Sequence, residues 1–334
     1  MNSGVVSGSR RPAAVARRAL QRQMEAWREL LAQCERRPGR KCVHALRVAT
    51  LRAQAGVEFC LAGRALGDTD ARAVRRWRKQ ASKLRRRLAP ARQADVFLTM
   101  LGQRRQEAAG GKDGAEGSQG YVDAIAELER AIGRGRQRAA KKVAAEIGER
   151  RKRLELLSRR VEDAFAGAAP VAGDGHLGGI AARMAALAGE FGELNEETLH
   201  GFRKRIKKIR YVAEIEGRTD PEAARAAAVL QRMAAAVGEW HDWQGLAAEA
   251  ARHFGQGQGE GLVRFLEGES ERSLERALEL CGRALAQLRR SVKGGDPLER
   301  DAGNGSSRRV PRKPAGSVQP EAQRDDSEEL TEAS

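Results

Sequence analysis

Apolar residues recur at helical spacing along most of the chain. Between Leu199 and Glu214 the intervals between apolar positions are 3, 4, 3 and 4, which places them on one face of a helix at about 100° per residue. The positions are Leu199, Phe202, Ile206, Ile209 and Ala213. Similar stripes occur within residues 12–37, 41–66 and 71–88. The pattern therefore predicts a chain of amphipathic helices, each with one face in a core.

Gly, Pro and turn residues interrupt this pattern and give the expected element boundaries. We expect helices at about 12–37, 41–66, 71–88, 91–108, 121–166, 177–192, 196–216, 221–237, 240–254 and 261–290. Pro90 is expected to separate the helices 71–88 and 91–108. Residues 1–11 and 291–334 are expected to be disordered, and 109–120 and 167–175 to act as a linker and a break, because Gly, Ser, Pro or charge dominates there. The sequence thus predicts an all-α domain over residues 12–290.

Two of the expected helices resemble each other. At an offset of 156 residues, His44 aligns with His200, Arg47 with Arg203 and Arg52 with Lys208. The apolar stripe shifts by the same offset and becomes Val43, Leu46, Thr50, Ala53 and Val57. A shared register of core and polar positions indicates an internal duplication. We therefore expect two pseudo-symmetric helical halves, 12–166 and 176–290, each with one H-x-x-R helix.

The net charge of the chain indicates a class of ligand. The net charge is +17, and aromatic residues make up only 4% of the chain. From Ser291 onward there are seven basic and nine acidic residues, a net of −2, so the remaining body carries +19. A helical body with that excess attracts a polyanion, which could be nucleic acid, an anionic membrane or a phosphate polymer.

Two helix faces concentrate the positive charge. Opposite the stripe of the 196–216 helix lie His200, Arg203, Lys204, Lys207, Lys208, Arg210 and Tyr211. The segment 72–92 holds ten Lys or Arg and no acid, with one face formed by Arg75, Lys79, Lys83 and Arg86 and flanked by Arg87. Like charges on one face repel each other, and an anionic ligand would convert that repulsion into attraction. A solvated basic face is the alternative interpretation of each run.

Several function classes are disfavoured. The four cysteines show no zinc-ligand spacing, and we expect them to be buried thiols in a reducing cytoplasm. No apolar run approaches 18 residues, so no membrane span is expected. The basic helices lack the clustered carboxylates that hold metal in phosphoryl transfer. We therefore expect no metal, no cofactor and no catalysis.

With these motifs in view, the chain resembles the CHAD family, the conserved-histidine α-helical domain. The first-half motif is carried by Val43, His44, Arg47, Val48, Ala49, Leu51 and Arg52, followed by a segment from Leu88 to Val96 that includes Arg92. The second-half motif is carried by Leu199, His200, Arg203, Lys207, Lys208, Arg210 and Tyr211, followed by Leu230-Gln231 and Gly238–Asp242. The resemblance implies two helical bundles whose basic helices line a central groove or pore. It also implies binding of inorganic polyphosphate and association with polyphosphate granules in the cytoplasm.

The resemblance and the charged faces together give one set of candidate polyphosphate-binding residues. They are His44, Arg47, Arg52, Arg75, Lys79, Lys83, Arg86, Arg87, Arg92, His200, Arg203, Lys204, Lys207, Lys208, Arg210 and Tyr211. Leu51, Gln54 and Gln93 depart from the family pattern, so we expect the first half to bind phosphate more weakly. Two interpretations of the histidines stay open: contact with the ligand, or a hydrogen bond that braces adjacent helices.

Three alternatives to polyphosphate binding alone remain. Sequence-nonspecific nucleic-acid binding would explain the charge equally well, although aromatic stacking platforms are scarce. The second alternative is an enzyme, either a phosphatase or a histidine phosphotransfer protein built on a helical bundle, although the basic helices lack clustered Asp or Glu. The triphosphatase domain with an E-x-E-x-K motif that precedes the domain in some relatives is not carried over, because this chain lacks that motif. The acidic cluster Asp325–Glu332 could recruit a partner protein, which the sequence does not identify.

Overall fold

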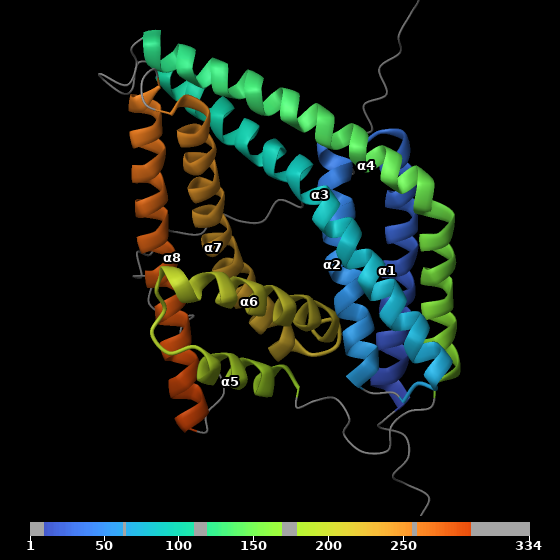
Figure 1. Ribbon diagram of the computed structural model, residues 1–334. Helices are drawn as coiled ribbons and strands as arrows, with labels where there is room; N and C mark the ends of the chain where they lie inside the picture. Colours follow the sequence, from blue (N-terminus) through green and yellow to red (C-terminus); the bar gives the residue numbers. More distant parts are fainter. Residues whose placement is uncertain (1–9, 63–64, 110–118, 169–178, 256–258, 295–334) are drawn as a thin grey trace, which may run out of the picture. The chain divides into compact units, whose positions relative to one another are not determined.

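The computed structural model describes residues 10–62, 65–109, 119–168, 179–255 and 259–294, and every regular element in these ranges is an α-helix. The helices are α1 (Arg10–Arg36), α2 (Arg40–Ala62), α3 (Asp68–Ala109), α4 (Gln119–Gly167), α5 (Ile180–Glu190), α6 (Glu196–Glu216), α7 (Pro221–Phe254) and α8 (Glu260–Gly294) (Figure 1). The predicted all-α class is confirmed. The expectations for the two termini, the linker and the break fall largely on residues outside the described ranges.

The apolar stripes drive the helices into cores as expected. In α2 and α6, all ten stripe positions are at most 2% exposed. The start of α6 is fixed by a capping box in which the Asn195 side chain accepts from the Thr198 amide at 2.9 Å and Thr198 Oγ1 accepts from the Asn195 amide at 3.0 Å. These bonds satisfy amides that have no partner inside the helix, so the sequence sets both the face and the first turn of α6.

Two predicted helix breaks are wrong. The helix α3 runs continuously through Pro90, where Pro90 and Arg86 are both exposed. Proline removes the bond to the carbonyl four residues back, but water can satisfy an exposed carbonyl. The helix α7 likewise continues past Gly238, because Val237 and Trp240 are buried on either side of it. Burial of these side chains offsets the roughly 1 kcal/mol that a helical glycine costs.

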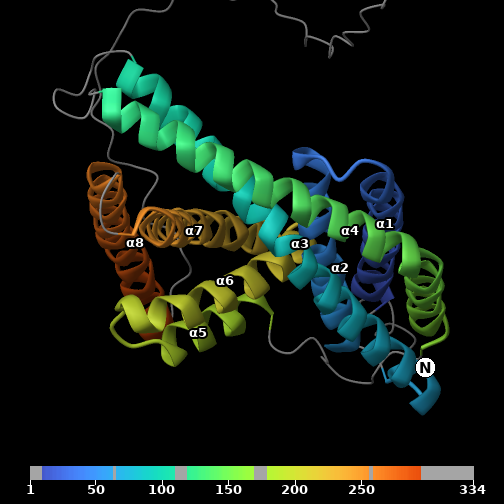
Figure 2. The same ribbon diagram turned by 45° about the horizontal axis from the view of Figure 1, so that its top comes forward.

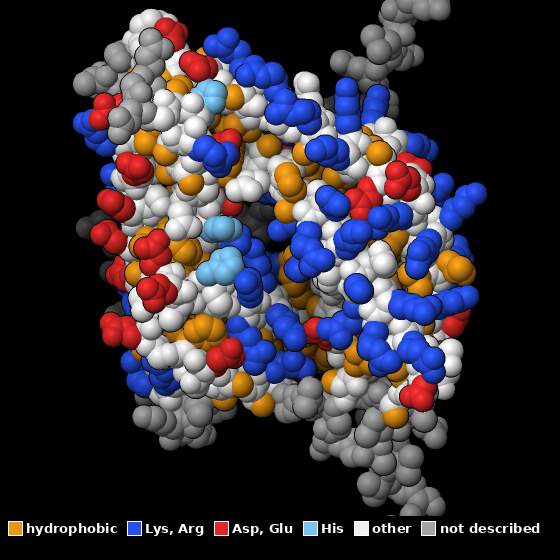
Figure 3. All heavy atoms as spheres, in the orientation of Figure 1, with side chains coloured by type: hydrophobic (Ala, Val, Ile, Leu, Met, Phe, Trp, Pro, Cys, Tyr) orange, Lys and Arg blue, Asp and Glu red, His pale blue; other side chains and the backbone are white. Residues whose placement is uncertain are grey.

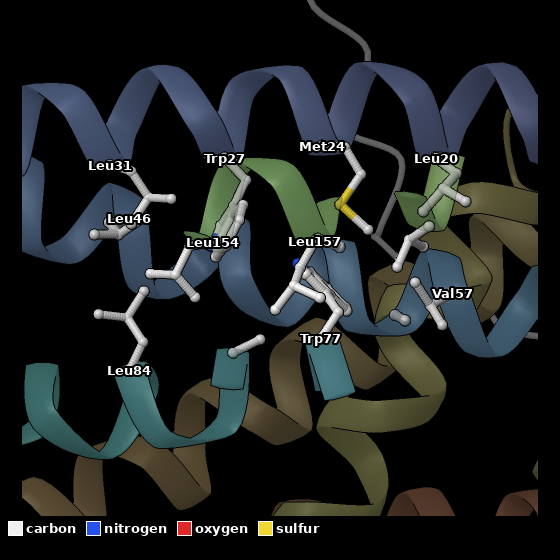
Figure 4. Packing of buried hydrophobic residues seen from close by; sticks show 14 of the residues in the cluster. Leu20, Met24, Trp27, Leu31, Leu46, Val57, Trp77, Leu84, Leu154 and Leu157 are labelled. Atoms are coloured by element: carbon white, nitrogen blue, oxygen red, sulfur yellow. The ribbon is translucent and has the colours of Figure 1, made fainter. Parts of the chain in front are cut away.

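The first hydrophobic core joins α1, α2, the first part of α3 and the last part of α4. Figure 4 shows Leu20, Met24, Trp27 and Leu31 pointing from α1 into this core. Trp27 contacts Trp77 edge to face, with ring centroids 5.6 Å apart, and its Nε1 donates to Thr50 Oγ1 at 3.0 Å. Thr50 is the one stripe residue of α2 with a hydroxyl group. Its bond with Trp27 Nε1 gives both buried polar groups a hydrogen-bond partner, as buried polar groups require.

A second core gathers α5, α6, the first part of α7 and the last part of α8. A third core combines the remaining parts of α3, α4, α7 and α8. It contains Phe97, Leu101, Leu128, Leu246 and Leu266, all at most 4% exposed. Figures 1 and 2 both show the second part of α3 running beside the first part of α4. The two halves thus share a core, while their origin in a duplication stays a prediction.

The cysteine expectation needs one correction. Cys34 at the end of α1 and Cys42 at the start of α2 form a disulfide, where two thiols were expected. The turn between the helices is short, so the two Cα atoms lie 5.8 Å apart, within the range of a disulfide. Cys60 and Cys281 lie outside this bridge and are buried. Burial raises the pKa of Cys281 to about 12.

Candidate functional site

The helix α6 packs against α2, which brings the two H-x-x-R helices together. Tyr211, Val212 and Ile215 of α6 belong to the first core, although the rest of the buried face of α6 belongs to the second. Two ion pairs cross the same contact, Arg52 to Glu214 at 3.2 Å and Lys208 to Glu58 at 3.1 Å. The contact therefore fixes how the basic faces of α2 and α6 meet.

Cations from three helices converge beside this contact. We call Arg47 of α2, Arg85 and Arg92 of α3, and Arg203 and Lys207 of α6 the central cationic site. Arg47 Nη1 donates to the carbonyl of Arg85 at 3.1 Å, which fixes the side chain of Arg47 against α3. Burial lowers the pKa of Arg47, and the nearby charges of Arg85, Arg203 and Arg92 lower it further. This mutual influence places the guanidinium groups within electrostatic range of each other.

Lys207 is the most perturbed cation of the central cationic site. Burial lowers its pKa to about 7, with further lowering by Arg203 and Arg47. In the described ranges, no acidic group lies within ion-pair distance of Lys207 or Arg203, and the buried Nε of Arg203 has no hydrogen-bond partner. Partly buried charges without partners destabilise a fold. A bound anion would supply the missing partner.

One carboxylate stands among these cations. Burial raises the pKa of Asp242 on α7, while Arg203, Arg92, Lys207 and Arg47 lower it. Asp242 therefore extends the site to a fourth helix and offsets part of its charge. One carboxyl group therefore faces five basic side chains, four of which are arginines.

Three histidines surround the central cationic site. The rings of His200 and His241 meet edge to face with centroids 5.8 Å apart. Burial lowers the pKa of His241 to about 4, with Arg203, His200 and Lys207 contributing, and burial also lowers the pKa values of His44 and His200. All three imidazoles are consequently neutral near pH 7, when each can donate one hydrogen bond. His44 and His200 are exposed, which favours contact with a ligand over a buried brace.

Some predicted site residues are engaged in ion pairs instead. Besides the pairs of Arg52 and Lys208, Arg87 lies 3.0 Å from Glu146 and Arg210 lies 3.3 Å from Glu214. Lys83 lines a small pocket with Glu146 and Arg150 of α4, away from the central cationic site. These contacts neutralise part of the predicted charge.

Tyr211 is also placed differently from the prediction. It was expected on the basic face, but it is 5% exposed and belongs to the first core. The guanidinium of Arg210 covers its ring at 4.3 Å. The burial follows from the contact of α6 with the first core, which the stripe of α6 alone does not reveal.

The remaining predicted residues are exposed cations. Arg75, Lys79, Arg86 and Lys204 all face solvent, the first three on α3 and the last on α6. Figure 3 shows Lys and Arg side chains gathered over α2, α3 and α6 on both sides of a hollow, with His side chains beside it. The exposed cations therefore continue the positive surface outward from the central cationic site.

The sequence interpretation missed three site residues. Arg85 follows Arg78 and precedes Arg92 by seven residues, a spacing that keeps side chains on one helix face and could have identified it. His241 and Asp242 fall at the start of the expected helix 240–254, whereas they lie in the middle of α7. The false break at Gly238 caused that error.

A metal-binding cluster and a membrane-spanning helix are both absent from the described part of the chain. No group of three or more His, Cys, Asp or Glu side chains there is arranged to hold a metal ion. None of the described helices is both long and apolar enough to cross a bilayer.

Comparisons with known proteins agree with this architecture. The family model of the CHAD domain matches residues 14–252. Two solved structures share the fold: PptA from Streptomyces chartreusis (17% identity, TM-score 0.59, covering 81% of this chain and 98% of that one) and the CHAD domain from the plant Ricinus communis (18% identity, TM-score 0.59, covering 82% and 90%). At these identities the likeness shows the fold alone. Among curated proteins, none matches the chain significantly.

Proposed function

The chain belongs to the CHAD-domain family, and on that premise we propose that it binds inorganic polyphosphate at the central cationic site. The main support for the proposal is that Arg47, Arg203 and Lys207 lie close together. In the described ranges, no acidic group lies within ion-pair distance of Arg203 or Lys207. Polyphosphate is a row of anions with no base edges and no apolar face. Closely spaced cations are therefore the main requirement for binding it.

The residue types suit phosphate oxygens. Arginine donates two parallel hydrogen bonds to one phosphate, while lysine acts as a compact charge. The guanidinium of Arg203, which has no ion pair in the described ranges, and the neutral imidazoles of His44 and His200 add donors at the same place. Binding would also remove the mutual repulsion of the five cations.

Sequence-nonspecific nucleic-acid binding is the second candidate, supported by the same positive surface. Single-strand binders usually stack bases on aromatic side chains. Tyr211, the aromatic residue nearest to the basic face in sequence, is buried in the first core and covered by Arg210. In a competition experiment at equal phosphate concentration, we expect duplex or single-stranded DNA to displace polyphosphate poorly. Efficient displacement would favour nucleic acid as the ligand.

The site assignment is tested with two variants that lose the same charge. The test variant combines Arg47→Gln, Arg203→Gln and Lys207→Gln, and the control combines Arg52→Gln, Arg87→Gln and Lys208→Gln, whose cations are in ion pairs. At about 1.5–3 kcal/mol per charged hydrogen bond, the test variant should lose several kcal/mol of polyphosphate binding free energy in calorimetry. The control should lose about 1 kcal/mol or less. Equal losses in both variants would remove the site assignment.

We further propose that the protein binds without catalysis and associates with polyphosphate granules. A carboxylate-held metal is the usual requirement of phosphoryl transfer. Incubation with polyphosphate should therefore release no orthophosphate and form no stable phosphohistidine. A fluorescent fusion should colocalise with granules, and the test variant above should not. Orthophosphate release that the test variant abolishes would make the protein an enzyme.

A further inference from the structure

Three exposed cations of α3 differ from the exposed arginines of α8. Exposed arginines on α8 are neutralised along the helix, as in Arg264 with Glu260 at 2.8 Å and Arg283 with Glu279 at 2.8 Å. Arg75, Lys79 and Arg86, which we call the α3 row, have no acid within the segment 72–92. No ion pair of these three was found in the described ranges either. The α3 row thus keeps a full local charge of +3.

The α3 row adjoins the central cationic site. Relative to Arg85, which faces the site, its members lie about 80–120° around the helix, all in the same direction. Along the axis, Arg75 and Arg86 are about 17 Å apart at 1.5 Å per residue. A linear anion that fills the central cationic site can therefore continue over the surface of α3 and meet three more cations.

The two regions offer different kinds of contact. Arg47, Arg203 and Lys207 are partly buried, so their charges act in a medium of low polarity. The α3 row is exposed, where water and salt screen each charge and a single contact contributes little. A short anion can be held by the central cationic site alone, whereas a long one gains from both regions.

We propose that the α3 row is a secondary binding region that gives the protein a preference for long polyphosphate over short. This inference rests on the proposed polyphosphate function and adds to it the basis of length selection. The central cationic site provides the strong contacts that any chain of a few phosphates can make. The α3 row adds salt-sensitive contacts that only a longer chain can reach.

The test compares tripolyphosphate with long-chain polyphosphate. The variant Arg75→Gln, Lys79→Gln, Arg86→Gln removes the α3 row, and the matched control Arg264→Gln, Arg272→Gln, Arg283→Gln removes the same charge from α8. All six side chains are exposed, so both variants should keep the wild-type circular dichroism spectrum and melting temperature. Affinity is measured by calorimetry at two salt concentrations.

For the α3 variant, affinity for the long polymer should fall about tenfold, and its log–log salt slope should become shallower by about three. Its affinity for tripolyphosphate should stay at the wild-type value, and the α8 control should bind both ligands like wild type. An equal loss for both ligands, or no loss for either, would overturn the inference while leaving the proposed function intact. A wild-type protein that binds neither ligand would instead overturn the proposed function itself.

Discussion

The helices α2 and α6 carry the same H-x-x-R motif in the same register, yet the structure uses them differently. Arg47 on α2 is fixed by a bond to the Arg85 carbonyl, whereas the buried Nε of Arg203 on α6 has no partner in the described ranges. At the matching core position α2 has the bonded Thr50 and α6 has Ile206, both 0% exposed. The comparison shows that α2 and α6 have different roles. The polar side chains of the α2 motif bond to other parts of the fold, whereas α6 presents cations with fewer bonds within the protein.

The largest expected difference concerns the two arginines. Arg203→Gln should weaken polyphosphate binding by about 1.5–3 kcal/mol, because its guanidinium is free to bond phosphate. Arg47→Gln should weaken binding less and lower the free energy of unfolding by about 1 kcal/mol, because it also removes the bond to α3. Calorimetry and urea denaturation of both variants measure these values. A larger loss of affinity in Arg47→Gln would reverse the assigned roles.

The next difference concerns the core position. Thr50→Val removes the acceptor of Trp27 Nε1 and should destabilise the protein by about 1–3 kcal/mol, because a buried donor is left unsatisfied. Ile206→Val at the matching site removes one methylene and should cost about 0.5–1.5 kcal/mol. Urea denaturation of the two variants gives the comparison. Equal costs would mean that the Thr50 bond adds little to the stability of α2.

Lys207, to which α2 has no matching lysine, should make binding dependent on pH. Its pKa in the free protein is about 7, and a bound anion should raise it toward its ordinary value, so binding takes up a proton. Affinity should therefore fall about tenfold between pH 6 and pH 8, as the charged fraction of Lys207 falls. Calorimetry in buffers of different ionisation enthalpy measures the proton uptake.

Lys207→Arg is the control, because arginine stays charged throughout this range and should flatten the profile. The stability of the free protein should depend on pH in the opposite direction from polyphosphate affinity. Because the pKa of Lys207 is lower in the folded than in the unfolded state, the unfolded chain binds more protons between pH 7 and about 10.5. The free energy of unfolding should then rise with pH across that window. An unchanged pH profile in Lys207→Arg would assign the dependence to another group.

The smallest expected effect concerns the ion-paired cations that align between the two helices. Arg52→Gln or Lys208→Gln should change polyphosphate affinity by less than about 1 kcal/mol, since Glu214 and Glu58 already neutralise these exposed side chains. Titration at physiological salt measures the change. A loss as large as that of Arg203→Gln would show that the ligand displaces the acidic partners.

The helical class and the core stripes follow from the sequence because apolar spacing reports a property of each helix alone. The basic faces follow for the same reason, as Arg47, Arg203 and Lys207 show. Contacts between helices depend on distant residues, so the burial of Tyr211 and the pairing of Lys208 with Glu58 were not predicted. Pro90 misled because it lies on the exposed side of α3, where water can satisfy the freed carbonyl. Gly238 misled because the buried side chains of Val237 and Trp240 offset the cost of a helical glycine.

The third core has a consequence for handling the protein in pieces. Phe97, Leu101 and Leu128 come from residues 10–168, and Leu246 and Leu266 from residues 179–294. Either fragment expressed alone would expose its share of this apolar surface to water, which favours aggregation. Mixing the two fragments should restore solubility and phosphate binding together. A chimaera between proteins of this architecture should therefore exchange both fragments together, because one fragment alone leaves the third core incomplete.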